Sequence, residues 1–107
     1  MSVKLVYDVV YADLASLVED TQMFSENTVS LYNEFVDAGK IIYIDSSVDT
    51  NTLTKTTIVT YVDQTAWDEY HERIVMLKAS GLWMIEGNAI SNPYLEYDDS
   101  SKVYLEN

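Results

Sequence analysis

The chain begins with an alternation of side chains that is typical of a β-strand. Over residues 3–11 the odd positions are all apolar or aromatic, whereas the even positions combine Lys4 and Asp8 with valines. Because successive side chains of a strand point to opposite faces, the pattern predicts one fully apolar face. The valines at Val6 and Val10 predict that the second face is partly covered as well.

The same period of two returns in the middle of the chain. It predicts a strand at residues 40–48, with Ile41 and Tyr43 on one face, and another at about 52–62. Residues 49–51 between them form an Asx-rich turn. The two strands are therefore expected to form a hairpin.

Helical spacing separates these strands. Residues 12–38 predict a helix in one or two pieces, in which Asp13 caps the first turn and Ser25 caps a second piece. Gly39 stands where a helix needs a left-handed residue to end. Thr28, Leu31, Tyr32 and Phe35 provide the apolar stripe.

A second helix follows the hairpin. Asp63 or Thr65 is expected to cap it, and Gly81 to end it. Its apolar positions recur at spacings of three and four residues, as one face of a helix requires. These positions are Trp67, Tyr70, Ile74 and Leu77.

The remaining residues predict a fourth strand at 82–85, extendable to Ile90, and then a turn at Asn92 and Pro93. Residues 94–97 and 103–105 predict short extended segments on either side of an Asp-Asp-Ser-Ser turn. We interpret residues 92–107 as a C-terminal extension, and we expect it to cross to a partner subunit.

The predicted order β-α-β-β-α-β indicates an α+β fold, a ferredoxin-like sandwich in which helices cover one face of an antiparallel sheet. Residues 1–107 fit a single domain. The second face carries Val, Ile, Thr and Tyr, for which water is a poor partner. Sheet-to-sheet packing in a homodimer would cover it.

The amino-acid composition excludes several kinds of functional site and several classes of protein. The 107 residues contain no Cys and a single His, which excludes disulfides, thiolate metal sites and any multi-histidine metal site within one chain. A hydrophobic content of 48% argues against disorder. The opening residues do not match a secretory signal, and no apolar run reaches the length of a transmembrane helix, so we expect a cytoplasmic protein.

The charge balance excludes some partners. Eighteen acidic residues stand against six basic ones, giving a net charge of −12. The chain lacks the basic stripe that nucleic-acid binding requires, and an anionic membrane would repel it. The acids are scattered, which is typical of a solvated surface. The alternative is an interaction protein that mimics DNA and acts on a basic partner.

The order of elements, the length and the segment Tyr61-Val62-Asp63-Gln64-Thr65-Ala66-Trp67-Asp68-Glu69-Tyr70-His71 resemble the dimeric α/β-barrel superfamily of antibiotic-monooxygenase-like proteins. The resemblance covers roughly residues 3–90. It implies a homodimer whose two sheets close into a barrel, with a pocket for apolar or aromatic molecules between helices and sheet. Haem-degrading members pair a helix Trp and His with a strand Asn, whereas the nearest strand counterpart here is Asp8, so no cofactor is expected.

His71 is the candidate catalytic residue, as a general base or ligand; the alternative is an ordinary surface histidine beside Asp68 and Glu72. The aromatic residues predict a pocket lining, although strands are rich in aromatics in any case. Asp98 and Asp99 lack an EF-hand pattern, and no metal site is expected. The predicted ligand-binding residues are Tyr7, Tyr43, Tyr61, Trp67, Tyr70, His71 and Trp83.

Three functions remain open. The first is binding of a small apolar or aromatic ligand between helices and sheet, which requires only a cavity. The second is a cofactor-independent enzyme of the monooxygenase or isomerase kind, in which His71 or a tyrosine moves a proton. The third is the acidic interaction protein.

Overall fold

A computed structural model of the chain describes residues 1–19, 23–24, 26–80, 85–86 and 89–105. These residues form an α+β fold built on a five-stranded antiparallel sheet, which confirms the predicted class. In chain order the elements are β1 (Val3–Val10), α1 (Leu14–Glu19), β2 (Met23–Phe24), α2 (Glu26–Asp37), β3 (Ile41–Asp49), β4 (Thr54–Tyr61), α3 (Gln64–Ala79), β5 (Ile85–Glu86), β6 (Ala89–Tyr97) and β7 (Lys102–Tyr104).

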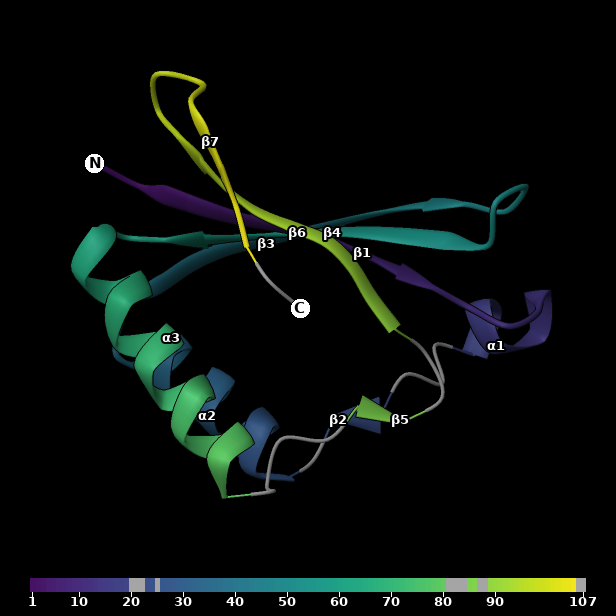
Figure 1. Ribbon diagram of the computed structural model, residues 1–107, viewed down its shortest axis with the longest axis horizontal. Helices are drawn as coiled ribbons and strands as arrows, with labels where there is room; N and C mark the ends of the chain where they lie inside the picture. Colours follow the sequence, from purple (N-terminus) through teal and green to yellow (C-terminus); the bar gives the residue numbers. More distant parts are fainter. Residues whose placement is uncertain (20–22, 25, 81–84, 87–88, 106–107) are drawn as a thin grey trace.

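The strands of the main sheet lie in the order β3-β4-β1-β6-β7, and β2 pairs separately with β5. The central strand β1 is antiparallel to both of its neighbours, β4 and β6. Figure 1 shows α2 and α3 together below one end of the sheet, whereas α1 lies near the opposite end. We call the side of the sheet that faces α2 and α3 the inner face, and the other side the open face.

The main core lies between α2, α3 and the inner face. The inner-face residues Val3, Val59 and Tyr61 are buried there against side chains of both helices. A smaller cluster of Val9, Tyr11 and Leu17 fixes α1 at the far end of β1. Tyr7 packs against both clusters and so occupies the inner face between them.

The predicted helix caps are largely confirmed. Asp13 accepts a hydrogen bond from the Ser16 backbone N–H at 2.8 Å, and Asp63 accepts one from Ala66 at 2.8 Å. These bonds satisfy N–H groups that a first helical turn leaves without partners. The alternative cap Thr65 lies inside α3 instead. Ser25 and Gly81 lie outside the described residues.

Gly39 ends α2 as predicted. Its φ is +73°, a left-handed conformation that costs glycine little. The Gly39 and Lys40 N–H groups donate to the carbonyls of Val36 and Phe35 at 3.1 and 2.9 Å. This pattern is a Schellman motif, and it turns the chain directly into β3.

The predicted alternation along β3 is wrong after its first residue. Ile41 is paired with Tyr61, but Tyr43 is paired with Thr60, so Ile42 is an extra residue in a β-bulge. The bulge shifts the alternation by one position. Tyr43 therefore lies on the open face, opposite to the side of Ile41.

The prediction for the fourth sheet strand is also wrong. Residues 82–84 lie outside the described residues, and Ile85 pairs with β2 rather than with the main sheet. The strand beside β1 is β6, which runs through the predicted turn at Asn92 and Pro93. Both residues stand opposite Tyr7 in a second bulge. A bulge tolerates proline within a sheet because the ladder hydrogen bonds are interrupted there.

The C-terminal segment completes the sheet of its own chain. Residues 92–97 belong to β6, and β7 pairs with β6 as a fifth strand. Residues 92–97 and 102–104 thus pair within their own chain, and the crossing of the segment to a partner subunit stays a prediction. The predicted Asp-Asp-Ser-Ser turn does connect the two strands, with Ser100 at a φ of +68°.

Within the residues that the structure describes, no helix has the length and apolar character needed to cross a membrane.

Candidate functional site

The candidate site is a group of four tyrosines between the helices and the inner face. Tyr7 comes from β1, Tyr32 from α2, Tyr61 from β4 and Tyr70 from α3. Tyr61 and Tyr70 are buried, with 1% and 8% of their surface exposed, whereas Tyr7 and Tyr32 are half-buried. Four separate elements thus bring phenol groups to one part of the core.

Aromatic contacts fix the two buried rings. The Tyr61 and Tyr70 ring centroids are 5.4 Å apart. Phe35 of α2 lies 5.0 Å from Tyr70 at an interplanar angle of 87°, and Trp67 lies 5.3 Å from Tyr61 at 69°. Such edge-to-face contacts contribute about 0.5–1.5 kcal/mol each beyond simple burial. The two rings are therefore held in defined orientations.

The electrostatics of the group favour neutral phenols. Burial is the main cause that raises the pKa of Tyr61 above its usual value. Electrostatic repulsion from the neighbouring phenols raises this pKa further; they are Tyr70, Tyr7 and Tyr32. Burial also raises the pKa of Tyr70, with Tyr7 and Tyr32 contributing in the same direction. These hydroxyls keep their protons at neutral pH, so they can donate hydrogen bonds and are weak proton acceptors.

The sheet beside Tyr7 adds further donors. Thr57 is opposite Tyr7 on β4 and is buried, with 5% of its surface exposed. Lys55 is opposite Val9, two pairs further along, and is half-buried. Directly paired residues share a face, so both belong to the inner face. The register places no Asp or Glu on the inner face of β1 or β4, although the chain has eighteen acids.

Trp67 and His71 lie beside the tyrosine group and extend from it to the surface. The His71 ring stacks on Trp67 at 5.4 Å and 19°. Trp67 is buried, whereas His71 is exposed. The imidazole is thus on the solvent side of the tryptophan.

The sequence-based site is brought together only in part. Tyr7, Tyr61, Trp67 and Tyr70 share one region of the core. Tyr43 lies on the open face, with 62% of its surface exposed, and Trp83 is outside the described residues. Tyr32 was missed, although it stands in the apolar stripe of the first predicted helix and that stripe had to face the sheet.

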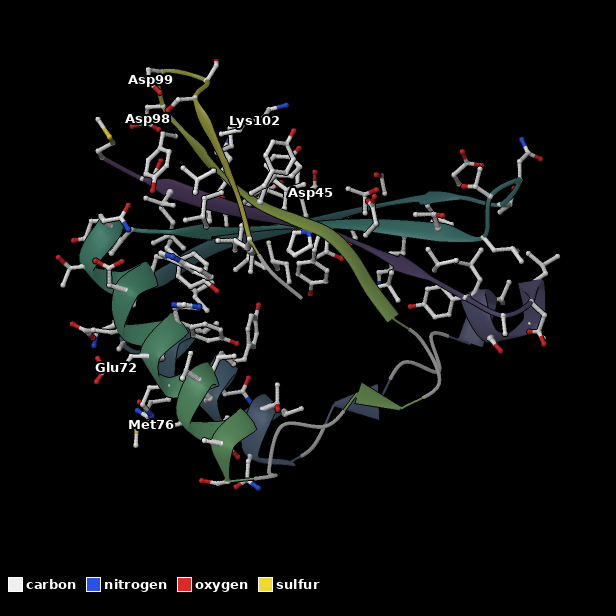
Figure 2. All side chains as sticks on the ribbon, viewed as in Figure 1. Asp45, Glu72, Met76, Asp98, Asp99 and Lys102 are labelled. Atoms are coloured by element: carbon white, nitrogen blue, oxygen red, sulfur yellow. The ribbon has the colours of Figure 1, made fainter. Side chains whose placement is uncertain are left out.

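A shallow groove of about 230 Å³ lies on the outside of α2 and α3. Two ion pairs occupy it: Lys40 to Glu69 at 2.6 Å and Arg73 to Glu34 at 2.9 Å. All four side chains are at least 40% exposed, and exposed ion pairs of this kind stabilise a fold little. Glu72, on the same helix as Arg73, points outward (Figure 2).

Among the described residues, no group of three or more His, Asp or Glu side chains is arranged to hold a metal ion. Comparison with known proteins gives no match to any family model and none to any curated protein sequence.

Proposed function

We propose that the protein binds a small aromatic or apolar molecule between the helices and the inner face of its sheet. The observation that carries this proposal is the convergence of four phenol groups from four elements on one part of the core. Binding sites for small molecules are commonly lined by aromatic side chains with a few polar groups that fix the orientation of the ligand, and tyrosine supplies both. A ligand with aromatic rings and acceptor atoms would pack on the tyrosine rings and hydrogen-bond to phenol hydroxyls.

The chemistry of the group indicates the character of the ligand. The raised pKa values of Tyr61 and Tyr70 keep these phenols protonated, and the Thr57 hydroxyl lies on the same face of the sheet. The ligand should therefore carry carbonyl, ether or other acceptor oxygens on an aromatic body. The same raised pKa values support binding more than proton abstraction by a tyrosine, which leaves the monooxygenase or isomerase alternative with less support.

We also assign the domain to the ferredoxin-like class. The observed strand order and antiparallel pairing are those expected of a βαββαβ chain whose first strand lies in the middle. In this interpretation β7 is an addition at one edge. The resemblance to the dimeric α/β-barrel superfamily stays a proposal with it, as does the cytoplasmic location.

The ligand proposal is tested with 6-propionyl-2-dimethylaminonaphthalene, a neutral naphthyl ketone whose fluorescence shifts in apolar surroundings and on hydrogen bonding. We expect the wild-type protein to bind it and shift its emission to shorter wavelength. Tyr32→Phe and Tyr70→Phe each remove one donor and should weaken binding roughly 2- to 12-fold, the range for one neutral hydrogen bond.

Tyr104→Phe is the matched control, because Tyr104 is 71% exposed on β7 and lies outside the tyrosine group. It should bind the ketone as the wild type does. Absence of any binding by the wild type would overturn the proposal. Equal binding by all three variants would place the ligand away from the tyrosines.

The homodimer is part of the same proposal. Across the open face Lys4, Glu96 and Lys102 stand in one row on β1, β6 and β7. Asp45 lies at the β3 end of this face, and Figure 2 shows Asp45 and Lys102 on the side of the sheet away from the helices. A two-fold axis parallel to the strands would place β3 over β7 of a second copy, with Asp45 two residues along β3 from the row of Lys102.

Light scattering of the eluting protein tests the dimer. We expect the mass of two chains for the wild type and a weaker dimer for Lys102→Asp. Combining Lys102→Asp with Asp45→Lys exchanges the two charges and should restore association. A wild type that stays monomeric at high concentration would refute the dimer without affecting the ligand test.

A further inference from the structure

β3 is an edge strand of the main sheet and carries exposed apolar side chains. β3 is the outermost strand at one side of the sheet and spans nine residues, of which all eight after Ile41 are exposed. Its large apolar side chains Ile42, Ile44 and Val48 are 54%, 48% and 55% exposed. An edge of this kind presents unpaired backbone groups to any strand that approaches it.

The backbone of β3 shows which groups face outward. The Ser46 N–H donates to its neighbour's side chain, Asp45 Oδ1, at 2.9 Å. It is therefore directed away from β4, toward the free edge. In an antiparallel ladder the outward positions alternate, so Ile44 and Val48 also direct their backbone groups to this edge.

The two faces of the edge differ in chemistry. Ile44 and Val48 pair with Val59 and Lys55, which places both on the inner face beyond the cover of the helices. Asp45 and Asp49 lie on the opposite face, and β3 contains no basic residue. A strand that added to this edge would meet apolar side chains on one side and carboxylates on the other.

We propose that the free edge of β3 docks an extended segment of another protein in which apolar and basic side chains alternate. The period of two places the apolar side chains of that segment on the face of Ile44 and Val48 and the basic ones on the face of Asp45 and Asp49. Backbone hydrogen bonds would supply the attachment and the charges its selectivity. The net charge of −12 on the chain favours the approach of such a partner over a distance.

A second copy of the chain is a poor occupant of this edge. An antiparallel β3–β3 pair centred on Ser46 would gather Asp45 and Asp49 of both copies on one face. β3 provides no cation there, so four carboxylates would repel one another. The contact of Asp45 with the Ser46 N–H further blocks an uncharged strand, whereas a lysine can draw the carboxylate away.

The test uses blocked heptapeptides and amide chemical shifts of the full chain. Lysine and valine alternate in the first peptide, glutamate and valine in the second, and the third has the composition of the first with all lysines before the valines. We expect the first peptide alone to shift the amides of Ile44, Ser46 and Val48. Equal shifts with the second or third peptide would overturn the role of charge or of alternation.

Two variants test the position. Ser46→Pro removes an N–H that β4 does not use, and it should weaken binding at least tenfold while the sheet resonances stay in place. Asp45→Asn should weaken binding several-fold, and Glu72→Gln is its matched control on α3 with no effect expected. Unchanged binding in both Ser46→Pro and Asp45→Asn would overturn the proposal. A wild-type dimer that Ser46→Pro dissociates would assign the edge to a second copy instead.

Discussion

Alkaline pH should unfold this protein through two particular phenols, because Tyr61 and Tyr70 are buried among other tyrosines. Their pKa values are raised in the folded chain, whereas in the unfolded chain both have the ordinary value of about 10. Below this pH both states hold the protons, and the contribution to stability is complete. Above it the unfolded chain loses protons that the folded chain keeps, so the free energy of unfolding falls until the pH reaches the folded pKa values.

The magnitude follows from the number of protons. Each phenol lowers the free energy of unfolding by about 1.4 kcal/mol per pH unit above its unfolded pKa, so the two together remove about 2.8 kcal/mol by about pH 11. That loss is a large part of the roughly 5–15 kcal/mol that stabilises a typical domain.

Urea unfolding at a series of alkaline pH values measures the slope. Tyr61→Phe and Tyr70→Phe should each make it shallower by about one proton, about 1.4 kcal/mol per pH unit. Tyr104→Phe should leave it unchanged, because that ring is exposed on β7. If all four proteins gave the same slope, the buried phenols would ionise as readily in the folded chain as in the unfolded one, and the electrostatic argument for the site would be wrong.

Three further predictions concern the backbone. Ser100 has a left-handed φ of +68° in the β6–β7 turn, so Ser100→Gly should raise the free energy of unfolding by up to about 1 kcal/mol. Ser101→Gly is the matched control. It removes the 2.6 Å hydrogen bond from the Ser101 hydroxyl to Asp99 and should lower the free energy of unfolding. Gly39→Ala should cost about 1 kcal/mol through backbone strain alone, since an added Cβ meets no atom within 4 Å; no loss in thermal unfolding would contradict this. Asp63→Ala should cost about 1 kcal/mol by removing the cap of α3, and Asp63→Ser should restore most of it.

Much of the fold could be predicted because its signals are local. The alternation in β1 and β4, the caps at Asp13 and Asp63 and the left-handed turn at Gly39 depend on neighbouring residues only. The edges of the sheet could not be predicted in this way. The residues next to Pro93 predict a turn. Pro93 lies inside β6 instead, because a bulge opposite Tyr7 accommodates it, and that bulge depends on pairing with a distant strand.

The candidate site was predictable to the extent that its residues lie on regular elements. Tyr61 and Tyr70 follow from strand and helix periodicity, and both face the core as expected. Tyr43 does not join them, because the bulge at Ile42 moves it to the open face. Tyr32 stood in the correct helical stripe, but a stripe alone does not distinguish a tyrosine that only packs from one that lies close to the tyrosines of the site.

The bulge in β3 also has a consequence for how the sequence can change. Ile42 has no partner on β4, whereas Ile41 and Tyr43 on either side are paired with the consecutive residues Tyr61 and Thr60. Deleting Ile42 would leave an unbroken ladder in which every later residue of the strand keeps its partner and its face. Deleting a residue in the middle of β4 would instead move one part of that strand to the wrong face. The strand can therefore lose one residue at this position without a change in its pairing, and a related chain that is one residue shorter here would keep the same inner face.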